Sequence, residues 1–278
     1  MNPYKIDGPA LLSFSGGRTS AYMLRMIMDA HGGTLPDDVI VCFQNTGKEA
    51  PETLDFIEEC SNRWDVPIVW LEYEETSIRG NWFKIVNHNS ASRNGEPFTR
   101  IIEKYNACPS GRNRFCTGIL KVQTSQKYAR HELMFDDYLS VVGLRADEPR
   151  RVANIKNNDP KYKESVCPVA EAGDTIREIN EFWERQDFRL NLPLAEKSTP
   201  LSNCDLCFLK GTKTIMRMIR EDPSRADWWI KTEKNFLDHG GFAKEKPLYA
   251  RMREMALSQY DMFDDMPDDS TIPCMCTD

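Results

Sequence analysis

A segment near the N-terminus combines two glycines with hydroxyl and guanidinium side chains, which are groups that hold phosphate in proteins. Its residues are Ser15, Gly16, Gly17, Arg18, Thr19 and Ser20. Glycines let the backbone turn tightly and approach a ligand, and the N-terminus of a following helix offers N–H groups to an anion. The segment therefore predicts a phosphate-binding turn, with an ordinary tight turn capped by a serine or threonine as the alternative. It is neither a Walker A nor a G-x-G-x-x-G sequence.

Basic residues are concentrated in the middle of the chain, although the formal net charge is −7. Residues 100–130 hold seven basic residues against one acidic residue, and Arg145, Arg150 and Arg151 follow. Guanidinium groups are well shaped to bind phosphate or sulfate oxygens. This distribution is typical of a protein that binds a small anionic ligand or makes one local contact with nucleic acid. A solvated charged face is the alternative.

The chain has nine cysteines, which favours metal binding or redox chemistry over a disulfide framework where no secretion signal is present. Cys204 and Cys207 form a C-x-x-C pair, and Cys108 and Cys116 form a wider pair. Four thiolates are enough for a zinc site or a [4Fe–4S] cluster. Free thiols are one alternative. Another is a ligand set that uses one of two cysteines near the C-terminus, Cys274 and Cys276.

The composition limits the class of protein. Apolar residues make up 40% and charged residues 28% of the 278 residues, as in a soluble globular protein. No apolar run approaches the roughly 18 to 20 residues that cross a bilayer, and residues 1–9 lack the pattern of a signal peptide. We therefore expect a cytoplasmic protein without a membrane contact.

Short apolar runs alternate with helical patterns in the first half of the chain. The runs predict buried strands at residues 10–15, 39–43, 68–71 and 138–144. Helical patterns cover residues 19–30 and 117–130, and another begins at Pro51. This alternation predicts an α/β fold with a parallel, Rossmann-like sheet and helices on both faces. The phosphate-binding turn would then lie at the carboxyl edge of the sheet, where ligands bind.

We expect two parts along the chain. Residues 1–173 form the α/β domain, and residues 174–278 form a small helical C-terminal subdomain that carries the C-x-x-C pair. Within the first part, residues 74–116 are polar and rich in glycine and proline, which predicts an irregular insertion. A connection of this length is usually a functional loop or a lid. Residues 145–173 are expected to be a second irregular stretch.

The phosphate-binding turn resembles the SGGxDS loop of the PP-loop superfamily, whose members are adenine-nucleotide α-hydrolase-like enzymes. Other segments resemble the PAPS (phosphoadenylyl-sulfate) reductase-like family within it, in the order that this family shows. They are residues 45–49 (NTGKE) with 51–53 (PET), 116–117 (CT) with 120–122 (LKV), 143–148 (GLRADE) with Arg150 and Arg151, and 167–169 (CPV). Two features depart from the family. Thr19 replaces the usual acidic residue, and the C-terminal cysteine motif of the reductases has only a loose echo in residues 274–276.

The resemblance implies an enzyme that binds an adenine nucleotide and performs sulfur-related chemistry. It places the phosphates on residues 15–20 and the rest of the nucleotide beside Asn45, Thr46 and Gly47. It also assigns a catalytic role, the neutralisation of phosphate or sulfate oxygens, to four basic residues: Lys121, Arg145, Arg150 and Arg151. Two acidic residues would orient these arginines or bind a metal ion such as Mg²⁺, namely Asp147 and Glu148.

The resemblance further favours an iron–sulfur cluster, rather than zinc, on four cysteines: Cys108, Cys116, Cys204 and Cys207. The nucleotide is either PAPS or adenylyl-sulfate (APS), or it is ATP. The retained glycines favour ATP, whereas Thr19 in place of the acidic residue opposes it. A protein that donates electrons or sulfur is an expected partner. Two other functions stay open: ATP-dependent nucleic-acid modification such as sulfur insertion, and a zinc-stabilised nucleotide-binding accessory protein.

Overall fold

The computed structural model describes residues 2–76, 82–156, 163–192 and 204–258. Its centre is a six-stranded sheet with the strand order β4-β3-β2-β1-β5-β6. The strands are β1 (Ala10–Ser13), β2 (Val39–Asn45), β3 (Ile68–Glu72), β4 (Lys84–Val86), β5 (Tyr138–Val142) and β6 (Lys163–Val166). Strand β4 pairs antiparallel with β3, and the other neighbours pair in parallel. The prediction of an α/β fold with a Rossmann-like parallel sheet is confirmed.

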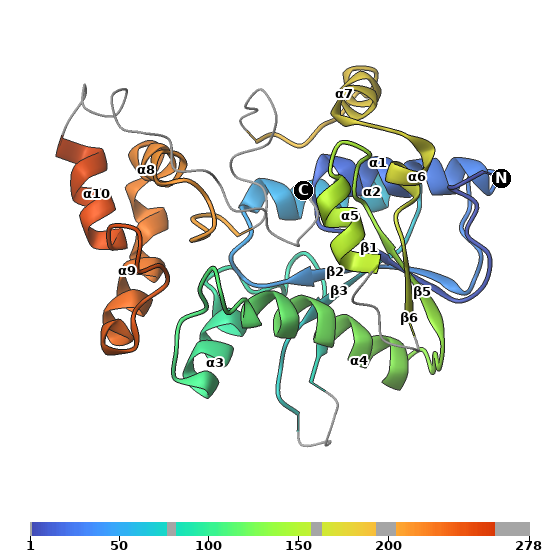
Figure 1. The fold of residues 1–278 in the computed structure, drawn as a ribbon. Coiled ribbons are helices and arrows are strands. Elements are labelled where there is room, and N and C mark those ends of the chain that lie inside the picture. Colours follow the sequence, from blue (N-terminus) through green and yellow to red (C-terminus); the bar gives the residue numbers. More distant parts are fainter. Residues whose placement is uncertain (1, 77–81, 157–162, 193–203, 259–278) are drawn as a thin grey trace.

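Helices cover both faces of the sheet, as Figure 1 shows. Helices α1 (Arg18–Ala30) and α2 (Pro51–Trp64) lie on one face, and η1 (Thr117–Gln123) and α4 (Thr124–His131) lie on the other. Alternate strand residues therefore pack in opposite directions. Leu11, Cys42 and Leu71, for example, share a cluster with Tyr128 of α4. Burial on both faces explains why the strand sequences are continuously apolar.

The path of the chain places a topological switch point at the carboxyl edge of the sheet. From β1 the chain moves outward through β2 to β3, and it later returns to β5 on the opposite side of β1. The connections that leave β1 and β5 therefore run in opposite directions. In open α/β sheets, ligands bind at such a topological switch point.

The two stretches expected to be irregular contain regular structure, which corrects that prediction. Residues 74–116 contain β4 and α3 (Glu96–Tyr105), and residues 145–173 contain α5 (Pro149–Lys156), β6 and α6 (Pro168–Ala172). Helix α3 forms because Phe98, Ile101 and Ile102 share one face, and all three side chains are buried. The described glycines and prolines of these stretches lie between the short elements or in the first turns of the helices, so the sequence pattern did not reveal the elements.

The last part of the described chain is helical. Helix α7 (Ile176–Glu184) packs on α1. Helices α8 (Thr212–Glu221), α9 (Ala226–Asn235) and α10 (Tyr249–Ser258) gather at the other end of the molecule, at the left of Figure 1, with short turns η2 (Pro223–Arg225) and η3 (Leu237–His239) between them. Their core is aromatic: the ring of Trp229 lies 5.0 Å from that of Phe242 and 5.2 Å from that of Tyr249.

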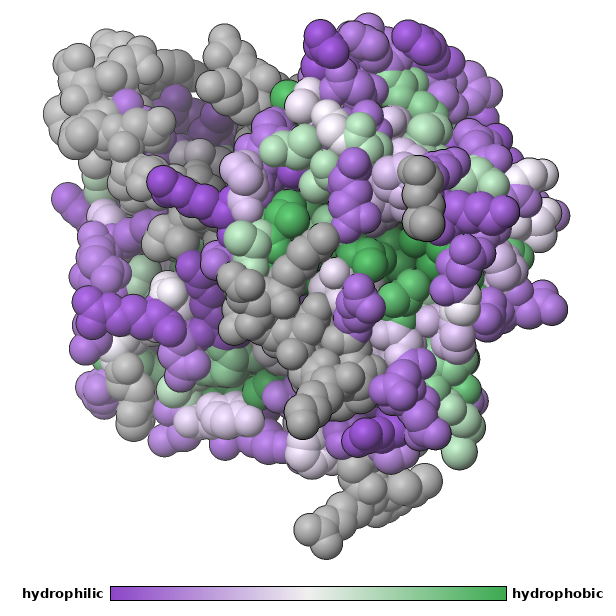
Figure 2. Space-filling model, turned by 45° about the vertical axis from the view of Figure 1, so that its right-hand side comes forward, coloured by the Kyte–Doolittle hydropathy of each residue, from purple (hydrophilic) through white to green (hydrophobic). Residues whose placement is uncertain are grey.

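The surface is mainly hydrophilic on the face shown in Figure 2, and apolar residues are visible chiefly near its centre. This agrees with a mean hydropathy of −0.56. Within the described ranges, each helix is too short or too polar to span a lipid bilayer.

Trp183 joins α7 to the α/β domain. Its ring lies 5.2 Å from the ring of Phe56 and 5.6 Å from that of Phe188, and its indole N–H donates to the carbonyl of Arg18 at 3.0 Å. We expect Trp183→Ala to lower the free energy of unfolding by about 3–5 kcal/mol, because it removes a large buried side chain. Leu237→Ala is the control, since Leu237 is 43% exposed and should change stability by less than about 0.5 kcal/mol. Denaturant unfolding, followed by far-UV circular dichroism rather than tryptophan fluorescence, measures both variants. Equal losses of unfolding free energy would contradict the role of Trp183 in joining α7 to the α/β domain.

Candidate functional site

The loop between β1 and α1 has a backbone that requires glycine. Gly16 has a φ of +78°, and a Cβ atom at this position would lie 2.5 Å from Cγ2 of Thr53. Hydrogen bonds hold the rest of the loop. The hydroxyl of Ser20 donates to the carbonyl of Gly17 at 2.9 Å, and it accepts from the backbone N–H of Ser15 at 3.2 Å. The predicted phosphate-binding turn is thus a tightly packed loop at the carboxyl end of β1.

The N-terminus of α1 suits an anion. Gly17 occupies the N-cap position without a side-chain hydrogen bond, and the first turn of the helix has no acidic residue. The first N–H groups of a helix have no partner within the helix, and they carry the positive end of its dipole. Thr19 and Ser20, which belong to this turn, are buried. The local structure therefore offers backbone donors at the carboxyl edge of the sheet.

Arg145 reaches this loop from the end of β5. Its Nη1 atom lies 3.5 Å from Oγ1 of Thr19, and its side chain is only 11% exposed. Asp147 accepts a hydrogen bond from Nε at 2.9 Å, and Glu148 accepts one from the backbone N–H of Arg145 at 3.1 Å. These two acids hold the guanidinium, which is one of the two roles predicted for them. A metal-binding role for them stays a prediction.

The loops after β1 and β5 touch through a glycine. A Cβ atom on Gly143 would lie 3.2 Å from the Cα atom of Ser20, so a larger residue would push the loops apart. Of the other predicted basic residues, Arg151 pairs with Glu148, whereas Arg150 is exposed on α5. The structure therefore joins Arg145 and Arg151 through one shared carboxylate, and it does not place Arg150 with them.

Asn45 shapes the loop that follows β2. Its amide nitrogen donates to Glu72 at 2.7 Å and to the carbonyl of Ser92 at 2.8 Å. Its amide oxygen accepts from the N–H of Gly47 at 3.0 Å. Gly47 has a φ of +77° and lies against the backbone of Gly95, so it too requires glycine. The side chain of Asn45 thus positions the loop, and contacts of Thr46 and Gly47 with a nucleotide stay predictions.

Glu49 is a buried carboxylate that the sequence analysis did not assign to the site. It accepts hydrogen bonds from the backbone N–H and the hydroxyl of Thr46, both at 2.9 Å. Burial raises the pKa of Glu49, and the positive charge of Lys121 acts in the opposite direction. Lys121 acts in the same direction on the pKa of Cys204, which burial raises. Lys121 therefore lies near Glu49 and Cys204.

The C-x-x-C segment docks on the loop after β2. Cys204 forms an antiparallel bridge with Glu49, and its sulfur lies 3.5 Å from the hydroxyl of Thr46. The N–H of Asp205 donates to the carbonyl of Lys48 at 2.7 Å, and the two side chains form a buried ion pair at 3.3 Å. In the sequence, the feature that indicates this junction is a pair of charged residues, Lys48 and Glu49, shortly after the buried strand β2.

Lys121 lies on a π-helical segment. Residues Thr117–Gln123 form η1, which continues directly into α4. Such wide turns are rare, and they are often found at functional sites. Thr124 donates its hydroxyl hydrogen to the carbonyl of Ile119 at 2.9 Å, which matches the wider winding. The sequence predicted a helix here, but it contained no sign of this winding.

The four predicted metal-binding cysteines lie in the region where α3, η1 and the C-x-x-C segment meet the core. Cys108 is 8% and Cys207 is 9% exposed, and burial raises the pKa of Cys108 to about 12. Four thiols suit zinc or a [4Fe–4S] cluster in chemistry. In the described residues, however, no three His, Cys, Asp or Glu side chains form a group that could hold a metal ion. A metal site on these four cysteines therefore stays a prediction. Cys274 and Cys276 lie outside the described residues.

The comparison with known families agrees with this arrangement. The family model of the phosphoadenosine phosphosulfate reductase domain matches residues 9–192. The chain belongs to this family. The matched residues include the β1–α1 loop, the loop after β2, η1 and Arg145. The family is one of nucleotide-binding, sulfur-related enzymes within the PP-loop superfamily.

Two curated relatives are uncharacterised proteins. One, the nin region protein ORF290 of Escherichia phage lambda, is 31% identical over 211 residues, which cover 74% of this chain and 67% of the relative. The other, protein MJ0066 of Methanocaldococcus jannaschii, is 29% identical over 238 residues, which cover 84% of this chain and 43% of the relative. The chain thus spans less than half of the archaeal protein.

Two solved structures resemble the fold at low identity. A phosphoadenylyl-sulfate reductase from Candida auris, in a phosphate complex, is 14% identical with a TM-score of 0.41, covering 69% of this chain and 82% of that one. The U34-tRNA thiolase NcsA from Methanococcus maripaludis, with its [4Fe-4S] cluster, is 12% identical with a TM-score of 0.37, covering 94% of this chain and 85% of that one.

Gly16 offers a test of the loop with an internal control. Gly16→Ala combines a positive φ with a steric clash, whereas Gly32→Ala has the same φ of +78° and no atom within 4 Å of the added Cβ. We expect Gly16→Ala to weaken binding of an adenine nucleotide at least tenfold, because the loop must move, and Gly32→Ala to leave it unchanged. Isothermal titration calorimetry with ATP and with PAPS measures the affinity of each variant. Thermal unfolding shows how much each substitution strains the folded protein. Equal affinities in the two variants would contradict the assignment of the loop.

Proposed function

We propose that this protein is an enzyme that binds an adenine nucleotide in the β1–α1 loop and uses it in a sulfur-related reduction or transfer. The phosphates or the sulfate would lie on the backbone N–H groups of residues 15–20. Arg145 would neutralise the anion that leaves during the reaction, because a preorganised cation stabilises developing negative charge. Lys121 would act on the side of the site that faces Glu49 and the C-x-x-C segment.

One observation carries this proposal. The guanidinium of Arg145 is largely buried, and it lies 3.5 Å from the hydroxyl of Thr19 in a loop whose helix has no side-chain cap. A buried cation beside uncapped N–H groups at a topological switch point is the arrangement expected for a phosphate or sulfate site. Membership in the phosphoadenosine phosphosulfate reductase domain family supports the same ligand class.

Two reactions are consistent with this site, and products distinguish them. In the first, a thiolate attacks the sulfur of PAPS or APS, the nucleotide leaves, and a second thiol then releases sulfite and forms a disulfide. In the second, ATP adenylates a substrate oxygen with release of pyrophosphate. A donor of sulfide-level sulfur then attacks the adenylated carbon, and the oxygen leaves as part of AMP. The retained glycines support the second reaction, whereas Thr19 in place of an acid supports the first.

A metal cofactor is a separate prediction, tested on protein purified without oxygen. About four irons with sulfide per chain would establish an iron–sulfur cluster, whereas about one zinc would make the cysteines structural. Cys60→Ser is the control for variants of Cys204, because Cys60 is a core residue of α2. Neither of the two reactions above is routed through this group.

Arg145→Ala tests the proposed function most directly. Loss of a charge-assisted pair of hydrogen bonds should weaken nucleotide binding by about ten- to a hundredfold. Arg177→Ala, which removes a side chain that is 78% exposed, should not change binding. Titration with ATP, APS and PAPS gives the affinities, and assays for sulfite and pyrophosphate identify the reaction. If neither variant changes binding of any of the three nucleotides, the site is wrong.

A further inference from the structure

Asp174 lies in the turn between α6 and α7, and its carboxylate accepts hydrogen bonds from two buried tyrosines. The hydroxyl of Tyr22, on α1, donates to Oδ2 of Asp174 at 2.9 Å, and the hydroxyl of Tyr4, from the segment before β1, donates to the same oxygen. The side chains of Tyr22 and Tyr4 are 7% and 9% exposed. Because hydrogen bonds to a carboxylate are stronger than those between neutral groups, these two bonds fix the turn on the first helix of the α/β domain.

The backbone of Asp174 connects the same turn to the loop after β5. Its carbonyl accepts a hydrogen bond from the N–H of Ala146 at 2.8 Å, and its own N–H donates to the carbonyl of Val169 at 3.0 Å. Ala146 directly follows Arg145, whose guanidinium lies near the hydroxyl of Thr19. Asp174 therefore joins α1, through its side chain, to the loop that carries Arg145, through its carbonyl.

A second contact from the same part of the chain reaches the β1–α1 loop. Helix α7 packs on α1 (Figure 1), and the indole N–H of Trp183 donates to the carbonyl of Arg18 at 3.0 Å. Thr175 and Glu178 form a capping box at the start of α7, directly after Asp174. Residues 174–184 are thus one ordered segment that makes a hydrogen bond to each of the two loops of the candidate site.

The two tyrosines act as hydrogen-bond donors rather than as acids. Burial raises the pKa of Tyr22 to about 12, and it also raises the pKa of Tyr4. Both hydroxyl groups therefore keep their hydrogen at neutral pH. Their contacts with Asp174 orient its carboxylate, and proton transfer to a substrate is not their role.

We infer that Asp174 is a positioning residue for Arg145. Gly143 allows the loops after β1 and β5 to touch, and Asp174 fixes where along that contact the second loop lies. The distance of 3.5 Å between Nη1 of Arg145 and Oγ1 of Thr19 depends on this anchor. The inference rests on the proposed function in one respect, which is that the ligand held by Arg145 is the nucleotide.

A pair of conservative substitutions tests this role. Tyr4→Phe combined with Tyr22→Phe removes both hydroxyl groups and keeps both rings. We expect the affinity for ATP or PAPS to fall about three- to tenfold, which corresponds to the loss of about one hydrogen bond. In the Arg145→Ala background the same pair should cause no further loss, because the group that Asp174 positions is absent. A purely structural role would instead weaken binding equally in both backgrounds.

The amide resonance of Ala146 reports the position of the loop in the folded protein without any nucleotide. In the double variant its amide proton should move upfield, because the hydrogen bond to the carbonyl of Asp174 becomes longer. Two-dimensional NMR of the full chain measures this shift. If the double variant does not fold, Tyr22→Phe alone serves for both measurements, with the same expected directions.

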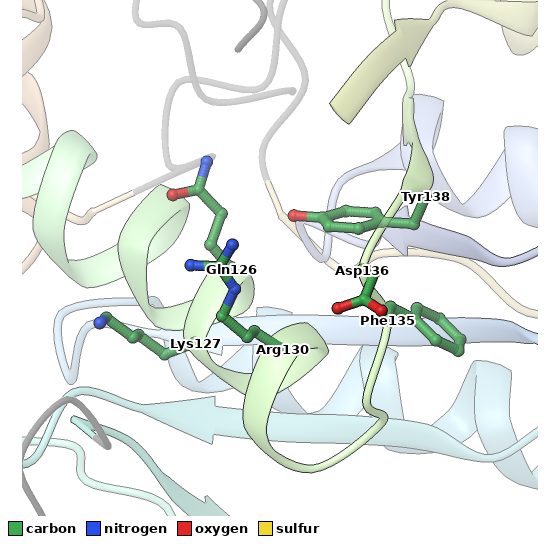
Figure 3. A pocket seen from close by; sticks show the side chains of 6 residues that line it. All are labelled: Gln126, Lys127, Arg130, Phe135, Asp136 and Tyr138. Atoms are coloured by element: carbon green, nitrogen blue, oxygen red, sulfur yellow. The ribbon is translucent and has the colours of Figure 1, made fainter. Parts of the chain in front are cut away.

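Two control variants change groups away from this anchor. Tyr73→Phe removes a buried hydroxyl that donates to the carboxylate of Glu75 at 3.0 Å, so it makes the same chemical change elsewhere. Lys127→Ala removes a cation from a pocket of about 110 Å³, which Figure 3 shows between α4 and Tyr138 at the start of β5. This pocket lies at the amino edge of the sheet, opposite Arg145. Neither variant should change nucleotide affinity or the Ala146 resonance.

Two outcomes overturn the inference. One is an unchanged Ala146 resonance in the double variant, and the other is an equal loss of nucleotide affinity with and without Arg145. If the wild-type protein binds neither ATP nor PAPS, the proposed function fails. The Ala146 resonance then still decides whether Asp174 holds the loop, since a shifted resonance supports the anchor and an unchanged one overturns it.

Discussion

The close approach of the β1–α1 loop to its neighbours is the constraint on which the site depends. Gly16 has no room for a Cβ atom beside Thr53, and Gly143 has little room beside Ser20. These contacts let the loops after β1 and β5 meet where the strand order reverses. Only with that meeting does Arg145 reach Thr19 with its guanidinium already held by Asp147 and Glu148. The close packing of these glycines thus positions the loops, and the positions of the charged side chains of the site depend on it.

A second junction connects this site to the C-terminal helices through buried charge. Lys48 and Asp205 form an ion pair that is about nine-tenths buried, and the indole N–H of Trp229 donates to the same carboxylate at 2.8 Å. A buried pair contributes little net stability, but removing one partner costs several kcal/mol because the other charge stays buried. The junction therefore fixes where the C-x-x-C segment docks. Glu49 and Cys204 meet because the neighbouring residues, Lys48 and Asp205, are locked together.

The sequence predicted the parts of the fold that depend on local pattern. The four apolar strands and the helices after them follow from the spacing of apolar residues. The glycine-rich turn follows from residue types that favour a particular backbone conformation. Strands β4 and β6 were missed because three- and four-residue strands at sheet edges carry almost no pattern. Asn45 was predicted to bind the nucleotide, but its amide group forms hydrogen bonds with Glu72, Ser92 and Gly47. No pattern in the sequence indicates these partners. The role of Glu49 could not be predicted because its burial depends on a segment more than 150 residues away.

The placement of η1 connects the two edges of the sheet. A π-helical segment carries Lys121 at the carboxyl edge of the sheet, where its charge acts on Glu49 and Cys204. The same helix then runs to the amino edge and ends beside the pocket at Tyr138. The π-helical segment and α4 therefore form one continuous element, and the position of Lys121 beside Glu49 depends on how Tyr128 of α4 packs against Leu11, Cys42 and Leu71 of the sheet.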